Sequence, residues 1–131
     1  MKKEKGFSLI ELLIAVAIVG IIAKIAYPSY LENVRQAKRK EAEAALISLA
    51  NALEMWRMQN GGKYDANSPT AASLLSATVP VDHARTATYN LSISAVAANT
   101  YTLSAAPIQS DPTCGTLTLD QAGTKLPANC W

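Results

Sequence analysis

A run of apolar residues that contains a single carboxylate constrains this chain more than any other feature. Between Phe7 and Ala23 the only charged residue is Glu11. A segment of this length and composition is typical of a membrane-spanning helix. A charge at the centre of a bilayer costs about 2.5–3.5 kcal/mol on insertion scales, and less near its edge. Glu11 is therefore expected to have a positively charged partner, which must come from another chain or from a terminus created by cleavage.

The residues before this run indicate where such a terminus arises. Residues 1–6, MKKEKG, are basic and end in glycine. An ordinary secretory signal has its small-residue cleavage site after the apolar region, whereas here the obvious junction before it lies between Gly6 and Phe7. A cut there leaves the apolar segment on the mature protein and frees an amine at Phe7 that can neutralise Glu11 of a neighbour. By the positive-inside rule the basic start is cytoplasmic, and everything after the helix lies across the membrane.

This N-terminal region resembles that of the type IV pilins. The resemblance rests on residues 6–12 (GFSLIEL), 17–23 (AIVGIIA) and 27–30 (YPSY). It implies cleavage after Gly6 by a prepilin peptidase, N-methylation of Phe7, and a role for Glu11 in guiding docking into a helical filament. Lys24 departs from the pattern, because such pilins usually carry a small apolar residue there.

The hydrophobic pattern predicts one long helix from about residue 8 to residue 59, which the sequence NGG at 60–62 ends. At 1.5 Å per residue it would be about 75 Å long, far more than a bilayer needs. Residues 7–30 are apolar all round and form the transmembrane and assembly segment. In residues 31–60 apolar side chains recur at steps of three and four, which is typical of a helix that packs on a globular domain.

Gly20 and Pro28 are expected to interrupt this helix. Proline removes a backbone hydrogen bond and kinks or loosens the preceding turn. The alternative for Gly20 is that small residues are common in membrane helices. The alternative for Pro28 is a static kink. The resemblance implies more, namely that this stretch melts or extends when the subunit joins a filament.

The remaining residues predict a small antiparallel sheet. Residues 61–87 are rich in Gly, Pro, Ser, Asn and Thr and read as a connecting loop with one helical turn at 71–75. Residues 88–131 form the sheet and the C-terminal region. Its three or four strands are expected at 88–93, 101–105, 115–120 and, returning, 124–126. One face of the sheet would pack on residues 31–60, which makes the fold α+β.

The two cysteines agree with an exported C-terminal region. Cys114 and Cys130 enclose fifteen residues, and in an oxidising compartment such a pair normally forms a disulfide. Two free thiols are the alternative. With His83, the only histidine, they do not make a structural zinc site. Residues 111–123 and the final Cys130-Trp131 are similar to the C-termini of PilE-like minor pilins of Gram-negative bacteria, which implies the type IV pilin fold with a disulfide-bounded end.

Charge and motifs argue against several classes of protein. The leader holds three of twelve basic and one of ten acidic residues, which leaves nine of each in the mature chain. Binding to DNA is therefore unsupported by overall charge, and from residue 85 to the C-terminus only Arg85 and Lys125 are basic. The charged run Arg35–Lys40 reads as a solvated helix face. No nucleophile elbow, phosphate loop or dinucleotide motif is present, so we expect no enzyme, cofactor or metal.

We therefore predict a structural subunit, a minor pilin, of a type IV pilus that serves adhesion, twitching motility or DNA uptake. Its expected partners are other pilin subunits, the prepilin peptidase, the inner-membrane assembly machinery and, before assembly, membrane lipid. The chain would reside in the inner membrane and then in the extracellular pilus, with its globular part periplasmic or extracellular.

Three alternatives share some of these features. A pseudopilin of a type II secretion system has the same N-terminus, but its commonest form carries a calcium site where this chain has a cysteine pair. A DNA-receptor competence pilin would need a basic patch on the sheet. A plain bitopic membrane protein would leave Glu11 unexplained. The sequence leaves open whether the subunit is major or minor.

Overall fold

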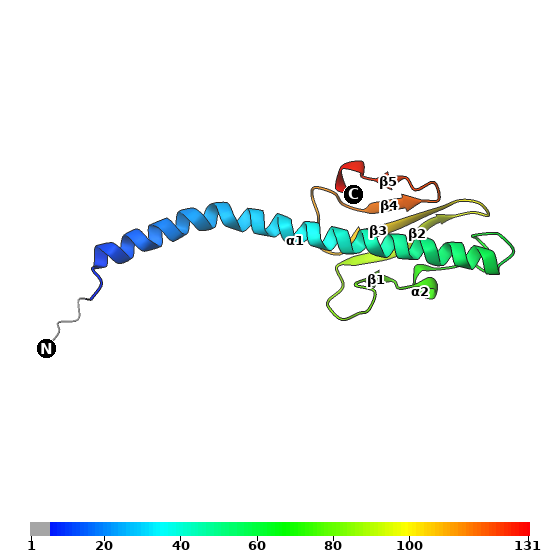
Figure 1. Cartoon of the computed structure of the whole chain (residues 1–131), viewed down its shortest axis with the longest axis horizontal. Coiled ribbons are helices and arrows are strands. Elements are labelled where there is room, and N and C mark those ends of the chain that lie inside the picture. The colour runs from blue at the N-terminus through cyan, green and yellow to red at the C-terminus, as the bar shows by residue number, and fades with distance from the viewer. Residues whose placement is uncertain (1–5) are drawn as a thin grey trace. The chain divides into compact units, whose positions relative to one another are not determined.

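A computed structural model describes residues 6–131. The elements are α1 (Leu9–Gln59), α2 (Ala71–Leu74), β1 (Thr78–Val79), β2 (Tyr89–Val96), β3 (Tyr101–Pro107), β4 (Leu117–Asp120), β5 (Lys125–Leu126) and the 3-10 turn η1 (Ala128–Cys130) (Figure 1). They form two compact units. The N-terminal unit ends at Arg35 and the C-terminal unit comprises Gln36–Trp131, so that α1 belongs to both.

The N-terminal unit is a single helix with an apolar surface. Its first turn starts where the Leu12 amide donates to the Ser8 carbonyl at 3.2 Å. Every residue from Gly6 to Tyr30 is exposed. Within the described residues, α1 is the one helix that is long and apolar enough to cross a membrane, judged by length and composition.

The helix is continuous through Gly20 and Pro28. A kinked or loosened turn at these two residues stays a prediction. Proline removes one amide donor and crowds one carbonyl, which costs about 3 kcal/mol, but the neighbouring turns keep their own hydrogen bonds. Pro28 is a weak point inside a formed helix, and melting in a filament stays a prediction.

The C-terminal unit contains a five-stranded antiparallel sheet in the order β1-β2-β3-β4-β5. The sequence predicts only three or four strands. The additional one is β1, in which Thr78 and Val79 pair with Asn90 and Tyr89 inside the stretch expected to be a loop. Two residues are too few for an alternating pattern, so β1 left no signal in the sequence.

The other predicted elements of this unit are present. The helical turn at 71–75 is α2, where the side chains of Thr70 and Ser73 form a capping box. The returning segment is β5, which pairs Lys125 with Leu119. Each remaining strand lies within two or three residues of its predicted bounds.

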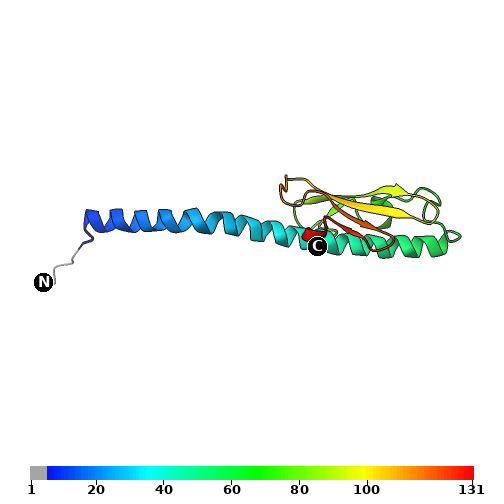
Figure 2. The ribbon, with the colours of Figure 1, turned by 90° about the horizontal axis from the view of Figure 1, so that it is seen from above.

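The core lies between the C-terminal half of α1 and one face of the sheet, as Figure 2 shows. Buried residues of α1 recur at steps of three and four, because that spacing keeps side chains on one face. The sheet contributes alternate residues of its three longest strands. The buried members are Ala42, Ala45, Leu46, Leu49 and Leu53 from α1, and Tyr89, Leu91, Tyr101, Leu103, Ala105, Leu117 and Leu119 from the sheet. Each buried leucine contributes about 1.5–3 kcal/mol, which makes this face the main source of the unit's stability.

Candidate functional site

The residues of the predicted cleavage site precede α1. Gly6, Phe7 and Ser8 lie outside regular secondary structure, and the Phe7 side chain is 86% exposed. A peptide bond in such a position is accessible to a peptidase. Residues 1–5 of the predicted leader lie outside the described residues.

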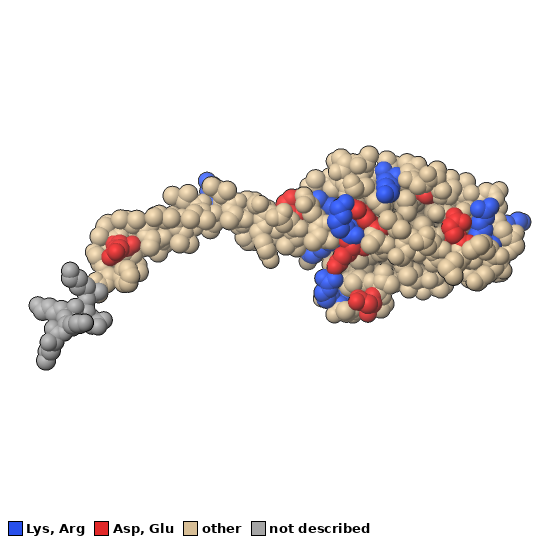
Figure 3. All heavy atoms as spheres, in the orientation of Figure 1, with Lys and Arg blue, Asp and Glu red and all other residues tan. Residues whose placement is uncertain are grey.

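Glu11 lies in the first turn of α1 and is exposed. A carboxylate is favoured there because the helix dipole is positive at its N-terminus, a contribution of about 0.3–1 kcal/mol at an exposed site. Its surroundings on the helix are apolar, including Ile10, Leu12 and Ile14, each more than half exposed. In Figure 3 charged side chains gather over the C-terminal unit and are sparse elsewhere.

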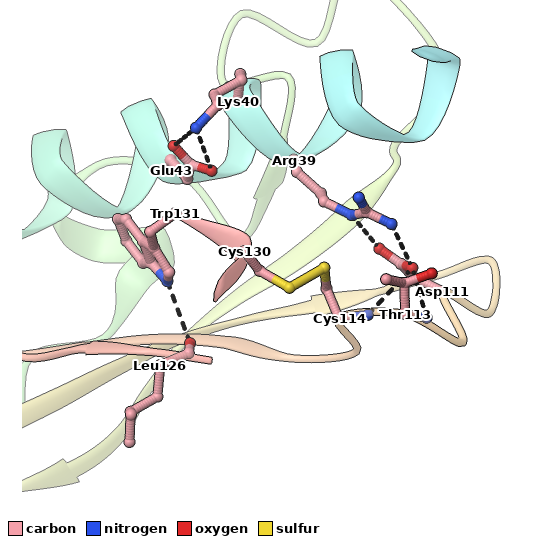
Figure 4. Close-up of a disulfide and its surroundings, with 9 residues drawn as sticks. All are labelled: Arg39, Lys40, Glu43, Asp111, Thr113, Cys114, Leu126, Cys130 and Trp131. Atoms are coloured by element: carbon pink, nitrogen blue, oxygen red, sulfur yellow. Dashed lines mark hydrogen bonds and ion pairs between the residues drawn. A yellow bond between two sulfur atoms is a disulfide. The ribbon is translucent and has the colours of Figure 1, made fainter. Parts of the chain in front are cut away.

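The C-terminal unit is closed by a disulfide. Cys114 and Cys130 are bonded, with their Cα atoms 5.9 Å apart, which confirms the pairing expected from the sequence (Figure 4). Cys114 follows the loop after β3, and Cys130 ends η1. The bond therefore joins the segments that precede β4 and follow β5.

A buried ion pair ties α1 to the start of this disulfide-bounded segment. Arg39 Nε donates to Asp111 Oδ2 at 2.6 Å, and Arg39 Nη2 donates to Asp111 Oδ1 at 2.7 Å. Their side chains are only 6% and 4% exposed. Asp111 Oδ1 also accepts from the amides of Thr113 and Cys114 (Figure 4). The hydrogen bonds from Arg39 and, to a lesser degree, from these amides hold the pKa of Asp111 below its ordinary value.

This pair was not predicted from the sequence, because the whole run Arg35–Lys40 reads as a solvated helix face. A signal was present. Arg39 stands three residues before Ala42 and seven before Leu46, so it continues the buried stripe of the helix.

Some of the other charges around this part of α1 are also paired. Lys40 Nζ lies 2.9 Å from Glu43 Oε2. Arg85 pairs with Glu41, which ties the loop before β2 to α1. Exposed pairs of this kind contribute little to stability, but they leave less positive charge free for an anionic partner.

The C-terminal tryptophan packs against the core. Trp131 Nε1 donates to the Leu126 carbonyl at 3.2 Å, as Figure 4 shows. Lys125 Nζ lies 5.0 Å from the centre of the indole ring, a distance at which a cation is attracted to the ring face. Among residues 6–131 no group of three His, Cys, Asp or Glu residues is placed to hold a metal ion.

Two family models match adjoining parts of the chain, which together cover residues 1–118. Residues 1–27 match the prokaryotic N-terminal methylation motif. Residues 28–118 match the family described as type IV minor pilin ComP, DNA uptake sequence receptor.

Individual relatives agree with this. A solved structure of a type IV pilin from Shewanella oneidensis is 35% identical, with a TM-score of 0.52 over 73% of this chain and 96% of that chain. The type II secretion system core protein G of Klebsiella pneumoniae is 29% identical over 65% of this chain and 60% of its own length. A fimbrial protein of Moraxella nonliquefaciens is 40% identical over 55% of this chain and 46% of its own length. The chain thus spans less than two thirds of these two curated relatives.

A long apolar helix on an antiparallel sheet, a C-terminal disulfide and a family match over more than half of the chain lead to the same assignment. The chain belongs to the type IV pilins, in the family of the minor pilin ComP.

Proposed function

We propose that this chain is a minor subunit of a type IV pilus and polymerises through residues 7–30. The observation that carries the proposal is an exposed apolar helix with a carboxylate in its first turn, inside the region that matches the N-terminal methylation motif. Such a surface is stable in lipid or against other apolar helices, and it is unfavourable in water.

The proposed sequence of events starts at the leader, residues 1–6. A prepilin peptidase cuts between Gly6 and Phe7 and methylates the new amine of Phe7. The helix then waits in the inner membrane, with the globular part on the periplasmic side. During assembly the subunit leaves the lipid and Glu11 accepts the Phe7 amine of a neighbouring pilin, which compensates both charges in an apolar filament core. We retain residues 31–60, 61–87 and 88–131 as the proposed divisions of the globular part.

The test is the substitution Glu11→Leu, compared with the isosteric Glu11→Gln. Removing the charge makes membrane insertion easier, whereas the neighbour's amine loses its partner. The amount of Glu11→Leu chain in the inner membrane should be unchanged or higher, and its amount in sheared pili should fall. Glu11→Gln should also be depleted in pili, because it keeps the shape but not the charge. Normal incorporation of both variants would show that the carboxylate does not guide assembly.

A pseudopilin role is a second candidate, favoured by the similarity to type II secretion system core protein G from several bacteria. The two roles differ in where the subunit is found. A pilus subunit appears in sheared surface filaments, whereas deletion of a pseudopilin abolishes protein secretion and leaves surface pili intact.

Reception of DNA is a third candidate, favoured by the description of the matched family. The C-terminal unit has seven basic and seven acidic residues, and several of its cations are paired. Any DNA contact would therefore depend on a few cations such as Lys63 and Lys125, both exposed. Binding of duplex DNA by the full chain in detergent should then weaken with salt with a logarithmic slope of about −0.9 per phosphate contact. Equal affinity for the variant Lys63→Gln/Lys125→Gln would contradict this candidate.

A further inference from the structure

The apolar segment contains a second charge that the proposed function does not use. Between Phe7 and Leu31 the charged residues are Glu11 and Lys24. Both are exposed, and neither has an ion pair among the described residues. We propose that the Lys24 ammonium is an assembly contact that pairs with the Glu11 carboxylate of a second copy of this chain. The proposal rests on the proposed function, in that residues 7–30 come together in a filament.

The two charges of one chain cannot satisfy each other. They are thirteen residues apart on a continuous helix. At 1.5 Å per residue this separates them by about 20 Å along the axis, several times the reach of an ion pair. The partner of each must therefore belong to another molecule.

Lys24 needs no partner while the chain is in the membrane. It lies one turn before Tyr27 and two turns before Tyr30, and tyrosines of this kind sit at the membrane surface. A lysine near the end of a membrane helix extends its long side chain to the head groups and keeps its charge in water. Inside a filament of packed apolar helices the head groups are gone, and an uncompensated ammonium becomes costly.

Charge complementarity identifies the partner of Lys24 as a second copy of this chain. The opposite charge carried by the same segment of a second copy is Glu11, and two parallel copies shifted by about 20 Å bring it level with Lys24. The shift brings apolar turns of both helices together as well, because every large side chain between the two charges is apolar.

The angular positions determine what kind of assembly results. Thirteen residues at about 100° each place Glu11 and Lys24 about 140° apart around the helix. Two copies therefore cannot form a symmetric pair in which the Lys24 of each copy contacts the Glu11 of the other. Each copy uses its Glu11 toward one neighbour and its Lys24 toward another, and head-to-tail contacts of this type extend into an open filament when they do not close.

The contact is compatible with the Phe7 amine. An amine at Phe7 is four residues from Glu11 and corresponds to a shift of about 6 Å between copies. A shift of about 20 Å belongs to a different neighbour. A carboxylate has two oxygens and several lone-pair directions, so one Glu11 can accept from the Phe7 amine of one neighbour and from the Lys24 ammonium of another.

Zero-length cross-linking of filaments tests the proposal. Sheared filaments of the unmodified chain are treated with dicyclohexylcarbodiimide, which joins an amine directly to a carboxylate. Because about 20 Å separates Lys24 from Glu11 within one helix, a peptide that links the two residues joins two copies of the chain. We expect this peptide, and its loss in Lys24→Gln. A Glu11 that cross-links to the Phe7 amine alone, or a Lys24 that cross-links to a different pilin, would overturn the self-pairing.

Incorporation of variants provides a second readout. Lys24→Gln should reduce the amount in sheared filaments by about tenfold, Lys24→Arg should restore most of it, and Lys38→Gln, outside residues 7–30, should change nothing. The amount in the inner membrane, measured alongside, should be equal for all three. If Lys24→Gln is incorporated normally while Glu11→Leu is not, this inference is wrong and the proposed function stands. If Glu11→Leu is also incorporated normally, the proposed function is wrong as well.

Discussion

At the scale of single residues, the pair Arg39–Asp111 shows how much depends on one contact. The two residues are 72 positions apart and lie on different elements. Asp111 accepts four hydrogen bonds in all, two from Arg39 and two from backbone amides at the start of the disulfide-bounded segment. It therefore couples the orientation of that segment to α1.

We expect Asp111→Asn to destabilise the protein by about 3–5 kcal/mol, because it removes the carboxylate charge that pairs with the buried Arg39 guanidinium. Urea unfolding of the full chain in detergent at pH 7 measures this. Asp65→Asn, at an exposed position, is the control and should have almost no effect. An equal midpoint for both variants would contradict a stabilising role for the pair.

The same carboxylate predicts a dependence on pH. The pKa of Asp111 is lowered in the folded state, so its stabilisation is fully present above the unfolded pKa of about 3.9 and is lost as pH falls through the folded pKa. The free energy of unfolding should therefore decrease below about pH 4. Asp111→Asn should lack that part of the decrease, and parallel acid curves for the two proteins would show that another group is responsible.

At the scale of elements, two connections decide how the chain behaves. The disulfide Cys114–Cys130 closes the segment that carries β4 and β5. β5 has two residues and pairs only with β4, so few hydrogen bonds hold it without the covalent link. In α1 the corresponding weak point is Pro28, where one backbone hydrogen bond is missing.

Cys114→Ser should lower the free energy of unfolding by about 2–5 kcal/mol, the range for a native disulfide in a small exported domain. Reduction of the unmodified chain should have the same effect, which separates loss of the bond from the effect of the serine itself. Detection of both thiols by labelling of the oxidised protein would refute the premise.

Pro28→Ala returns an amide to the helix and should stabilise it by about 3 kcal/mol. If the stretch melts on joining a filament, this variant should accumulate normally in the membrane and be depleted in sheared pili. Hydrogen exchange of residues 24–27 should be fast in filaments of the unmodified chain and slow in the variant. Gly20→Ala, where an added Cβ has open space, should act in the same direction by about 1 kcal/mol. Slow exchange in unmodified filaments would mean that the helix stays formed.

At the scale of the whole molecule, the chain separates two kinds of surface. The N-terminal unit exposes apolar side chains from Phe7 to Tyr30, whereas the C-terminal unit has a buried apolar core and carries most of the charge. The first surface requires lipid or other helices, and the second tolerates water. A protein with both is suited to pass from a membrane into a filament.

The processed molecule should begin at Phe7. A cut after Gly6 removes three basic residues and one acidic residue and leaves a chain with nine of each. Intact mass spectrometry of the exported protein should give this N-terminus, with the additional mass of one methyl group. If the exported chain instead began at a residue after Ala23, the N-terminal segment would be an ordinary signal peptide and the assembly proposal would be wrong.

The features that depend on local chemistry were predictable from neighbouring residues. The apolar run around Glu11 predicted α1, and the glycines at 61–62 predicted its end, because helix periodicity and helix termination depend on residues close in sequence. Alternation predicted β2, β3 and β4, and two cysteines in an exported region predicted their bond.

The features that depend on contacts between distant residues were visible only in the folded chain. Arg39 is buried because Asp111 meets it across the core, and a charged side chain with no visible partner in the sequence is assigned to solvent by default. β1 is a strand because Tyr89 and Asn90 of β2 offer it hydrogen bonds, while two residues alone carry no period. The hydrogen bonds that make β1 a strand form only when the chain is compact, so they leave no trace in its own two residues.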